Sequence, residues 1–164
     1  AVKMYEDRIE RAVALFKSGY NCSQSVVAAF ADLYGFTFEQ SLRMSASFGA
    51  GIGRMRLTCG TACGLFQLLG LDLSAVEGAD RATKAANYRL VQRYAERLRA
   101  INGSITCSEL LGLKGREHTD PVPEARTEAY YKKRPCPKLV ETAARLFAEY
   151  LEEKQAGAEA AQNA

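Results

Sequence analysis

Apolar residues recur along most of the chain with the spacing of amphipathic helices. The first stripe places its side chains on one helical face, and its members are Tyr5, Ile9, Ala12, Val13 and Phe16. No segment alternates convincingly between apolar and polar residues, and no repeat has the period of a solenoid. The pattern predicts an all-α protein, folded as a compact bundle of about six or seven helices.

Capping residues divide this pattern into separate helices. Asn21 with Gln24, and Thr37 with Gln40, predict two helix starts, and Gly19 ends the helix before them. Further starts are predicted at Thr58, at Ser74 with Glu77, at Thr106 with Glu109, and at Pro135 or Pro137. The helices that begin at Thr37, Thr58 and Ser74 are expected to end near Phe48, Leu69 and Ile101. The helix from Thr106 is expected to be short, and the last helix is expected to end near Glu153. The helix from Ser74 is expected to be the longest.

Three segments fall outside these helices. The glycine-rich run FGAGIGRMRLT before the central helix is typical of a loop. Residues 114–133 are polar without a stripe, and Asp120 before Pro121 predicts the cap of a short helix there. We expect one helical domain with a cysteine cluster over residues 1–155, followed by a low-complexity tail over 156–164, frayed or weakly helical.

The composition and charge of the chain argue against several classes of function. The length of 164 residues fits one domain, and a net charge of +3 is too small to indicate a nucleic-acid partner. No apolar run approaches the roughly 18 residues of a membrane span, so membrane insertion is not expected. The start AVKMYEDRIE lacks a basic segment followed by an apolar one, which favours a cytoplasmic location. A homodimer is compatible with the pattern, although no heptad seam requires one.

The chain contains five cysteines, but only one histidine and no tryptophan. In a cytoplasmic chain such cysteines favour metal binding or redox chemistry over a static disulfide framework. His118 lies in the polar segment, where a surface residue is the simpler interpretation and a ligand or proton donor the alternative.

The cysteines occupy special places on the predicted helices. Cys22, Cys59, Cys107 and Cys136 each lie in the first turn of a different helix, and Cys63 lies one turn beyond Cys59. All five project from the apolar face. An ordinary core also buries cysteines, but packing does not explain why they recur at helix starts. We therefore favour a functional thiol cluster at one interior site over inert core residues.

A helix start suits a thiol that has to react. Its unpaired N–H groups and dipole favour an anion, which lowers the pKa of a thiol placed there. Basic residues precede two of the cysteines, and they are Arg54, Arg56, Lys132, Lys133 and Arg134. We expect these charges to add to the effect.

Other motifs are weaker. FGAGIGRM carries Arg54 where a dinucleotide fingerprint needs glycine, and no strand precedes it. There is no C-x-x-C and no C-x-x-C-H, which leaves a thioredoxin-type site unsupported and excludes c-type haem attachment. Cys59 and Cys63, four residues apart, suit two ligands of one metal better than a disulfide. A basic stripe formed by Arg89, Arg93 and Arg97 is either a solvated face or an anion or partner site.

The segments NCSQSVVAAF, FGAGIGRM, TCGTACG, CSELLGL and CPKLVETAARLF, in this order, resemble the C_GCAxxG_C_C family of redox-active proteins. That family is defined by four cysteines and a C-G-A-x-x-G motif, and the resemblance runs from about Tyr20 to Leu151. The matching positions are Cys22, Cys59 with Gly60 and Gly64, Cys107, and Cys136. Thr61 stands where the motif has alanine, and Cys63 is a thiol beyond the family's four. The resemblance implies redox activity, with a hint of electron transfer.

Three hypotheses remain open. The preferred one is a thiol–disulfide redox protein that uses the five cysteines, with Cys59 attacking, a cysteine of another helix resolving, and a redox partner protein or small thiol as partner. The second is a metal-binding module in which an iron–sulfur cluster or zinc is held by Cys22, Cys59, Cys107 and Cys136. The third is a helical interaction protein whose cysteines only pack.

Overall fold

The computed structural model describes residues 4–114 and 118–163. Residues 115–117 of the polar segment and residue 164 of the tail lie outside this description. The described residues fold as helices joined by turns, so the predicted all-α class is confirmed. In chain order the elements are α1 (Glu6–Lys17), α2 (Cys22–Ala28), η1 (Ala31–Tyr34), α3 (Phe38–Ser45), η2 (Ala46–Phe48), α4 (Gly49–Ile52), α5 (Gly60–Leu73), α6 (Arg81–Asn102), α7 (Cys107–Leu110), α8 (Glu128–Lys133) and α9 (Cys136–Gln162).

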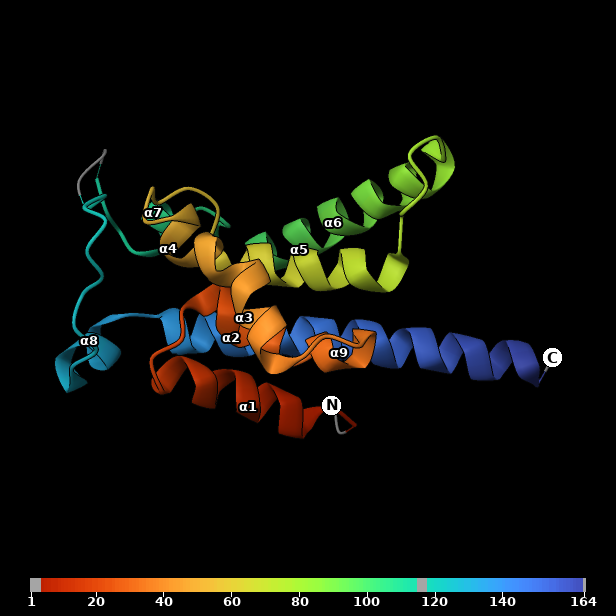
Figure 1. Cartoon of the computed structure of the whole chain (residues 1–164), viewed down its shortest axis with the longest axis horizontal. Coiled ribbons are helices and arrows are strands. Elements are labelled where there is room, and N and C mark those ends of the chain that lie inside the picture. Colours follow the sequence, from red (N-terminus) through yellow and green to blue (C-terminus); the bar gives the residue numbers. More distant parts are fainter. Residues whose placement is uncertain (1–3, 115–117, 164) are drawn as a thin grey trace.

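Helix α9 runs along the long axis of the molecule, with α1 on one side of it and α5 on the other (Figure 1). Helix α2 packs against α1, α5 and α9, and α6 lies over α5 and diverges from it toward its own first residue. The starts of α5 and α9 lie at the same end of the molecule, near α7 and α8. Among the described helices, none has the length and apolar character needed to cross a bilayer.

Two of the four predicted capping boxes are present. The Asn21 side chain accepts a hydrogen bond from the Gln24 N–H, and the Gln24 side chain accepts one from the Asn21 N–H. Thr37 and Gln40 make the same reciprocal pair at the start of α3. These two starts were readable from sequence because each pair satisfies two backbone N–H groups without help from distant residues. Helix α7 begins at Cys107 as expected, but the Thr106 side chain makes no cap hydrogen bond, and Glu109 accepts from the Ser104 hydroxyl instead.

The predicted helix start at Ser74 is wrong. Helix α5 continues to Leu73, and Ser74 closes it in a left-handed conformation (φ 59°) while its N–H bonds to the Gly70 carbonyl at 3.0 Å. An N-cap needs an extended backbone, so Ser74 cannot end one helix and begin the next. Helix α6 begins instead at Arg81, where the Asp80 carboxylate accepts from the Thr83 N–H at 3.0 Å.

The predicted cap at Asp120 is also wrong. Asp120 accepts a hydrogen bond from the Val122 N–H at 2.8 Å and closes a turn. Pro123 disfavours a helical conformation at Val122 before it, so no helix grows from this turn. The short helix of the segment is α8, and its cap is Thr127, whose side chain accepts from the Tyr130 N–H.

The last helix extends further than expected. Helix α9 continues past Glu153 to Gln162 and, at 27 residues, exceeds the 22 of α6 that was expected to be longest. Its final turns are rich in alanine, the residue with the highest helix propensity. A hydrogen bond of 3.3 Å from Gln155 to Glu159 also links adjacent turns there.

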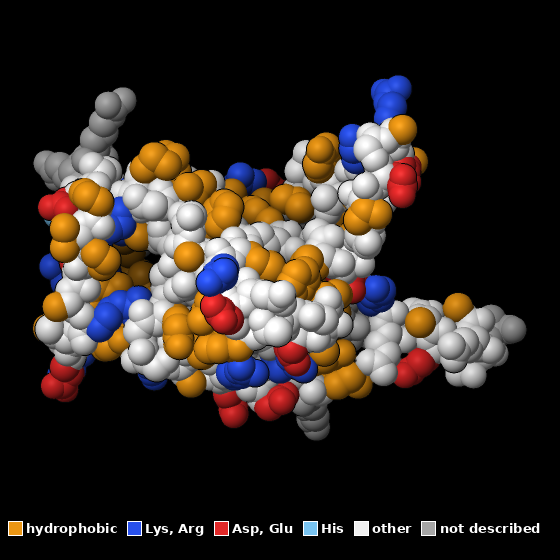
Figure 2. Space-filling model, viewed as in Figure 1, with side chains coloured by type: hydrophobic (Ala, Val, Ile, Leu, Met, Phe, Trp, Pro, Cys, Tyr) orange, Lys and Arg blue, Asp and Glu red, His pale blue; other side chains and the backbone are white. Residues whose placement is uncertain are grey.

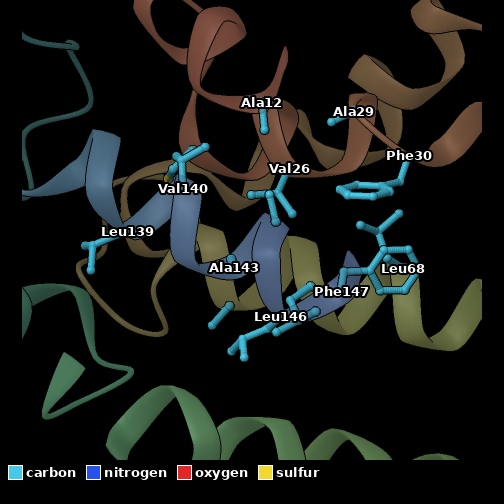
Figure 3. Packing of buried hydrophobic residues seen from close by; sticks show 14 of the residues in the cluster. Ala12, Val26, Ala29, Phe30, Leu68, Leu139, Val140, Ala143, Leu146 and Phe147 are labelled. Carbon is cyan, nitrogen blue, oxygen red and sulfur yellow. The ribbon is translucent and has the colours of Figure 1, made fainter. Parts of the chain in front are cut away.

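The core lies where α1, α2, α5 and α9 meet (Figure 3). Phe30 and Phe147 pack edge to face with ring centroids 5.0 Å apart, and both are fully buried. Val26, Val140 and Leu139 continue this packing toward the starts of α2 and α9. The apolar faces of these helices therefore hold the two helix starts in place.

Two arginines of the basic stripe on α6 contact α9. Arg97 pairs with Glu149 at 2.9 Å, and Arg93 lies 3.9 Å from Glu153. Both guanidinium groups also stack over the buried Tyr94 ring. Arg93 and Arg97 thus serve the packing of α6 against α9, while Arg89 is exposed.

A buried carboxylate joins α5 to α9 near the last residue of α5. Asp72, with 8% of its side chain exposed, accepts hydrogen bonds from Tyr34 at 3.0 Å, Tyr150 at 2.5 Å and Lys154 at 2.8 Å. Burial alone would raise the pKa of Asp72, but the hydrogen bonds from Lys154, Tyr150 and Tyr34 together hold it below its ordinary value. The charged form is therefore favoured by folding.

We expect the Asp72 contribution to stability to disappear in acid. A lowered pKa in the folded state contributes stability that is present above the unfolded pKa of about 4 and is lost as the pH falls through the folded pKa. Asp72→Asn should cost about 2 kcal/mol at pH 7 because the bonds to a charged acceptor are lost. Urea unfolding at pH 7 and at pH 3 checks this, and an equal cost at both pH values would contradict it.

Candidate functional site

Four cysteines of four different helices line a single cavity of about 300 Å³. Cys22, Cys107 and Cys136 are the first residues of α2, α7 and α9, and Cys59 is the N-cap of α5. Three of these side chains are buried, and Cys136 is half-buried. The structure therefore brings together the four thiols whose positions at helix starts suggested a common site.

A short backbone ladder holds Cys59 beside Cys107. The Cys59 N–H donates to the Ile105 carbonyl at 2.7 Å, and the Cys107 N–H donates to the Leu57 carbonyl at 2.6 Å. These bonds flank an antiparallel bridge between Thr58 and Thr106. Because the ladder comes directly before both helices, it fixes the distance between their starts.

Two glycines allow the chain to approach the thiols closely. A Cβ on Gly60 would lie 2.3 Å from the Cys22 sulfur, and a Cβ on Gly51 would lie 2.5 Å from the Cys107 Cβ. Gly51 also has a positive φ of 73°, a conformation that glycine adopts without strain. Any larger residue at either position would push a thiol out of place.

The glycine-rich run, expected as a loop, begins with the last residue of η2 and the four-residue helix α4. Ala50 and Gly51 within α4 have positive φ, and Ile52, Arg54 and Arg56 follow with φ values of 61–65°. The Leu57 N–H closes this turn on the Gly51 carbonyl at 2.9 Å. The segment wraps around the cavity and brings Arg54 and Arg56 to its wall.

Cys63 lies apart from the other thiols. It is buried one turn into α5, its sulfur is 3.9 Å from the Thr58 carbonyl oxygen, and it is absent from the described residues that line the cavity. The structure therefore separates Cys63 from the set of four that the sequence analysis grouped with it.

Thr61 contacts the thiol of Cys59. Its hydroxyl oxygen lies 3.1 Å from the Cys59 sulfur, and both residues are buried. Thr61 is also a lining residue of the cavity. When Cys59 is ionised, this hydroxyl can donate a hydrogen bond to the sulfur anion.

The expected lowering of the thiol pKa is reversed for the cysteines of α2, α7 and α9. Burial, with repulsion from a Cys59 thiolate as the next cause, raises the pKa of Cys22 to about 12 and that of Cys136 to about 11. Burial also raises the pKa of Cys107, although a hydrogen bond from Arg56 opposes the rise. The cost of removing the sulfur anion from water exceeds the benefit of the helix start.

A negative charge on Cys59 would affect the pKa of each of the other four thiols. It would raise the pKa of Cys22, Cys63, Cys107 and Cys136. Ionisation of one thiol therefore disfavours ionisation of its neighbours, which couples the thiols of the cluster.

Arginines form much of the remaining wall. Arg56 is 6% exposed, and its guanidinium lies 3.7 Å from the Cys107 sulfur and donates to the His118 carbonyl at 3.1 Å.

Arg54 and Arg134, which the sequence analysis named as basic neighbours, also line the cavity. Lys132 and Lys133, named with them, are exposed and lie outside the described lining. His118 is itself exposed and reaches this region through its backbone.

Arg126 and Tyr130 were missed by the sequence analysis. Both line the cavity, and the Arg126 guanidinium stacks 4.2 Å from the Phe16 ring centroid and 5.2 Å from that of Tyr130. The one available signal was the placement of an arginine shortly before paired tyrosines in a polar segment. That pattern is too common to single out a site.

The four cysteines carry the soft donor atoms that zinc and iron–sulfur clusters prefer. Within residues 4–114 and 118–163, however, no three side chains of Cys, His, Asp or Glu are arranged to share one metal ion. The thiols as positioned in this structure therefore do not fit the predicted metal site.

Comparison with known proteins identifies the family. The family model C_GCAxxG_C_C, described as “Putative redox-active protein (C_GCAxxG_C_C)”, matches residues 20–150. The chain belongs to the C_GCAxxG_C_C family. No curated protein and no solved structure matches the chain. The C_GCAxxG_C_C match includes all the cysteines that line the cavity, and it supports a redox role in general terms.

Proposed function

We propose that this protein carries out thiol–disulfide exchange in the cavity, with Cys59 as the sulfur that attacks first. The observation that carries the proposal is that Cys59 lines the cavity together with the three cysteines that begin α2, α7 and α9. Its contact with the Thr61 hydroxyl adds a donor for the anion. The redox character of the family agrees with this chemistry.

The exchange has two steps. The Cys59 thiolate attacks one sulfur of a substrate disulfide, forms a mixed disulfide and releases the other half of the substrate as a thiolate. A second cysteine then loses its proton and attacks the Cys59 sulfur, which releases the remaining half as a second thiolate. Two protein thiols become one disulfide, and the substrate gains two electrons and, after protonation, two protons.

Cys22 is the cysteine best placed for the second step. A Cβ on Gly60, the residue next to Cys59, would lie 2.3 Å from the Cys22 sulfur. A reduced dithiol protein or a small thiol would then restore the pair. We place this cycle in the cytoplasm, where such reductants keep buried thiols reduced.

Mapping the disulfide tests the proposal. Reduced protein is treated with hydroxyethyl disulfide, the remaining thiols are alkylated, and peptides are analysed by mass spectrometry. We expect a Cys22–Cys59 disulfide in the wild type and in a Cys63→Ser control. An unchanged count of five free thiols would contradict the proposal.

The same preparation examines the alternatives. An anaerobic absorption spectrum is recorded, and the iron and zinc content is measured. Stoichiometric iron or zinc would favour a metal centre over thiol exchange. A variant with serine at all four cavity cysteines that folds and keeps its biological role would instead favour a structural role for the cysteines.

A further inference from the structure

We propose that the cavity selects small disulfides that carry carboxylates, and that Arg126 binds this negative charge. The inference rests on the proposed function, because it names the substrate class of the same site.

The described lining is positively charged. It contains four arginines, which are Arg54, Arg56, Arg126 and Arg134, and one acidic residue, Glu124, so three positive charges remain after subtraction. Glu124 is already engaged by Arg134 at 2.5 Å. Arg54 donates to the backbone carbonyl of Asp120, a neutral acceptor that does not cancel the charge of the guanidinium.

Arg126 is held in position by neutral groups. Its guanidinium donates to the carbonyls of Phe16 at 2.8 Å and Tyr20 at 3.1 Å, and it is stacked against Phe16 and Tyr130. Carbonyl oxygens and ring faces orient a guanidinium but do not neutralise it. A rigid, partly buried arginine without a carboxylate among its described partners is well suited to bind a carboxylate with two parallel hydrogen bonds.

Arg126 differs from Arg56, whose charge acts on a thiol of the protein itself. Arg56 lies against the Cys107 sulfur and offsets part of the cost of ionising it. No described contact joins Arg126 to a sulfur, although it is close enough to Cys136 to lower that pKa slightly. The geometry therefore assigns Arg56 to the thiols and Arg126 to the substrate.

The size of the cavity limits the substrate. A volume of about 300 Å³ accommodates a small disulfide and is too small for a folded partner to enter. A carboxylate beside Arg126 would place the neighbouring sulfurs of such a molecule within the same cavity as Cys59.

Three disulfides of matched shape test the inference. Dithiodipropionate ends in two carboxylates, hydroxyethyl disulfide in two hydroxyls and cystamine in two ammonium groups. Each rate with the reduced protein is divided by the rate with dithiothreitol to remove intrinsic reactivity. We expect the dicarboxylate to react about tenfold faster than the neutral disulfide, the size of one charge-assisted hydrogen bond, and cystamine to react slowest.

Variants assign the preference to Arg126. Arg126→Met should abolish the tenfold preference for the dicarboxylate over hydroxyethyl disulfide, while Arg126→Lys, which keeps the charge, should retain part of it. Arg89→Met, which changes an exposed arginine of α6 outside the described cavity lining, is the matched control. An equal loss with all three disulfides would show that Arg126 acts on the thiols, and it would overturn the inference.

Binding without reaction separates this inference from the proposed function. Calorimetric titration of Cys59→Ser protein with dithiodipropionate should show binding that Arg126→Met weakens about tenfold. If the wild type binds the dicarboxylate in this way but exchanges no disulfide, the proposed function fails and the anion site stands. If exchange proceeds without any charge preference, the anion site fails and the proposed function stands.

Discussion

Replacing Cys59 with serine should stop disulfide reduction. A serine hydroxyl does not ionise near neutral pH and cannot form a mixed disulfide, so the first step has no nucleophile. We expect the rate with hydroxyethyl disulfide to fall on the order of a thousandfold or more, as when a covalent nucleophile is removed from an enzyme. The hydroxyl of the new serine can still bond to Thr61, which lies 3.1 Å from the present sulfur, and the fold should be retained.

Cys63→Ser is the matched control for this experiment. It removes a thiol of the same helix that stands outside the described cavity lining, and its rate should stay close to that of the wild type. Stopped-flow measurement of both variants, with circular dichroism to verify folding, decides the matter. A Cys59→Ser protein that reduces the disulfide at the wild-type rate would remove Cys59 from the mechanism.

The second large effect is expected from Gly60→Ala. The added methyl group would lie 2.3 Å from the Cys22 sulfur and 2.8 Å from the Phe48 carbonyl oxygen. Because the carbonyl belongs to the backbone of η2, α5 and η2 would have to separate. We expect a loss of about 3 kcal/mol in the free energy of unfolding, together with displacement of the first two thiols of the proposed exchange.

Gly70→Ala on the same helix is the comparison. A Cβ at Gly70 meets no atom within 4 Å, and alanine is the better helix former by up to about 1 kcal/mol. Urea unfolding of both variants should therefore show opposite signs. Equal stability of the two proteins would mean that the close approach at Gly60 is not required.

The parts of the fold that sequence predicted are those governed by local bonds. Asn21 and Thr37 satisfy backbone groups three residues away, and their helices begin where expected. Ser74 shows the limit of this reasoning. Its spacing to Glu77 suits a cap, but the residue is needed to close α5, and that depends on how far α5 extends in its packing against α6 and α9.

In the candidate site, too, the features set by neighbouring residues could be predicted from sequence, and those set by distant residues could not. The cysteines could be placed because each stands beside a local helix signal. Thr61 departs from the family motif in the sequence, but its contact with Cys59 is seen only in the structure. Arg126 could not be placed, since the carbonyls that orient it belong to Phe16 and Tyr20, more than a hundred residues earlier in the chain. The direction of the thiol pKa shifts also depended on burial, which sequence does not measure.

The origin of the cavity thiols in four separate helices ties the oxidation state of the protein to its resistance to unfolding. Cys22 and Cys59 are separated by more than thirty residues of sequence, and a disulfide between them would close a loop that the unfolded chain otherwise leaves open. Crosslinks of this length typically add about 3–4 kcal/mol. By the same thermodynamic cycle, the folded chain favours the disulfide more than the unfolded chain does. Thermal melts of the oxidised and reduced forms would therefore report the redox state of the cluster directly.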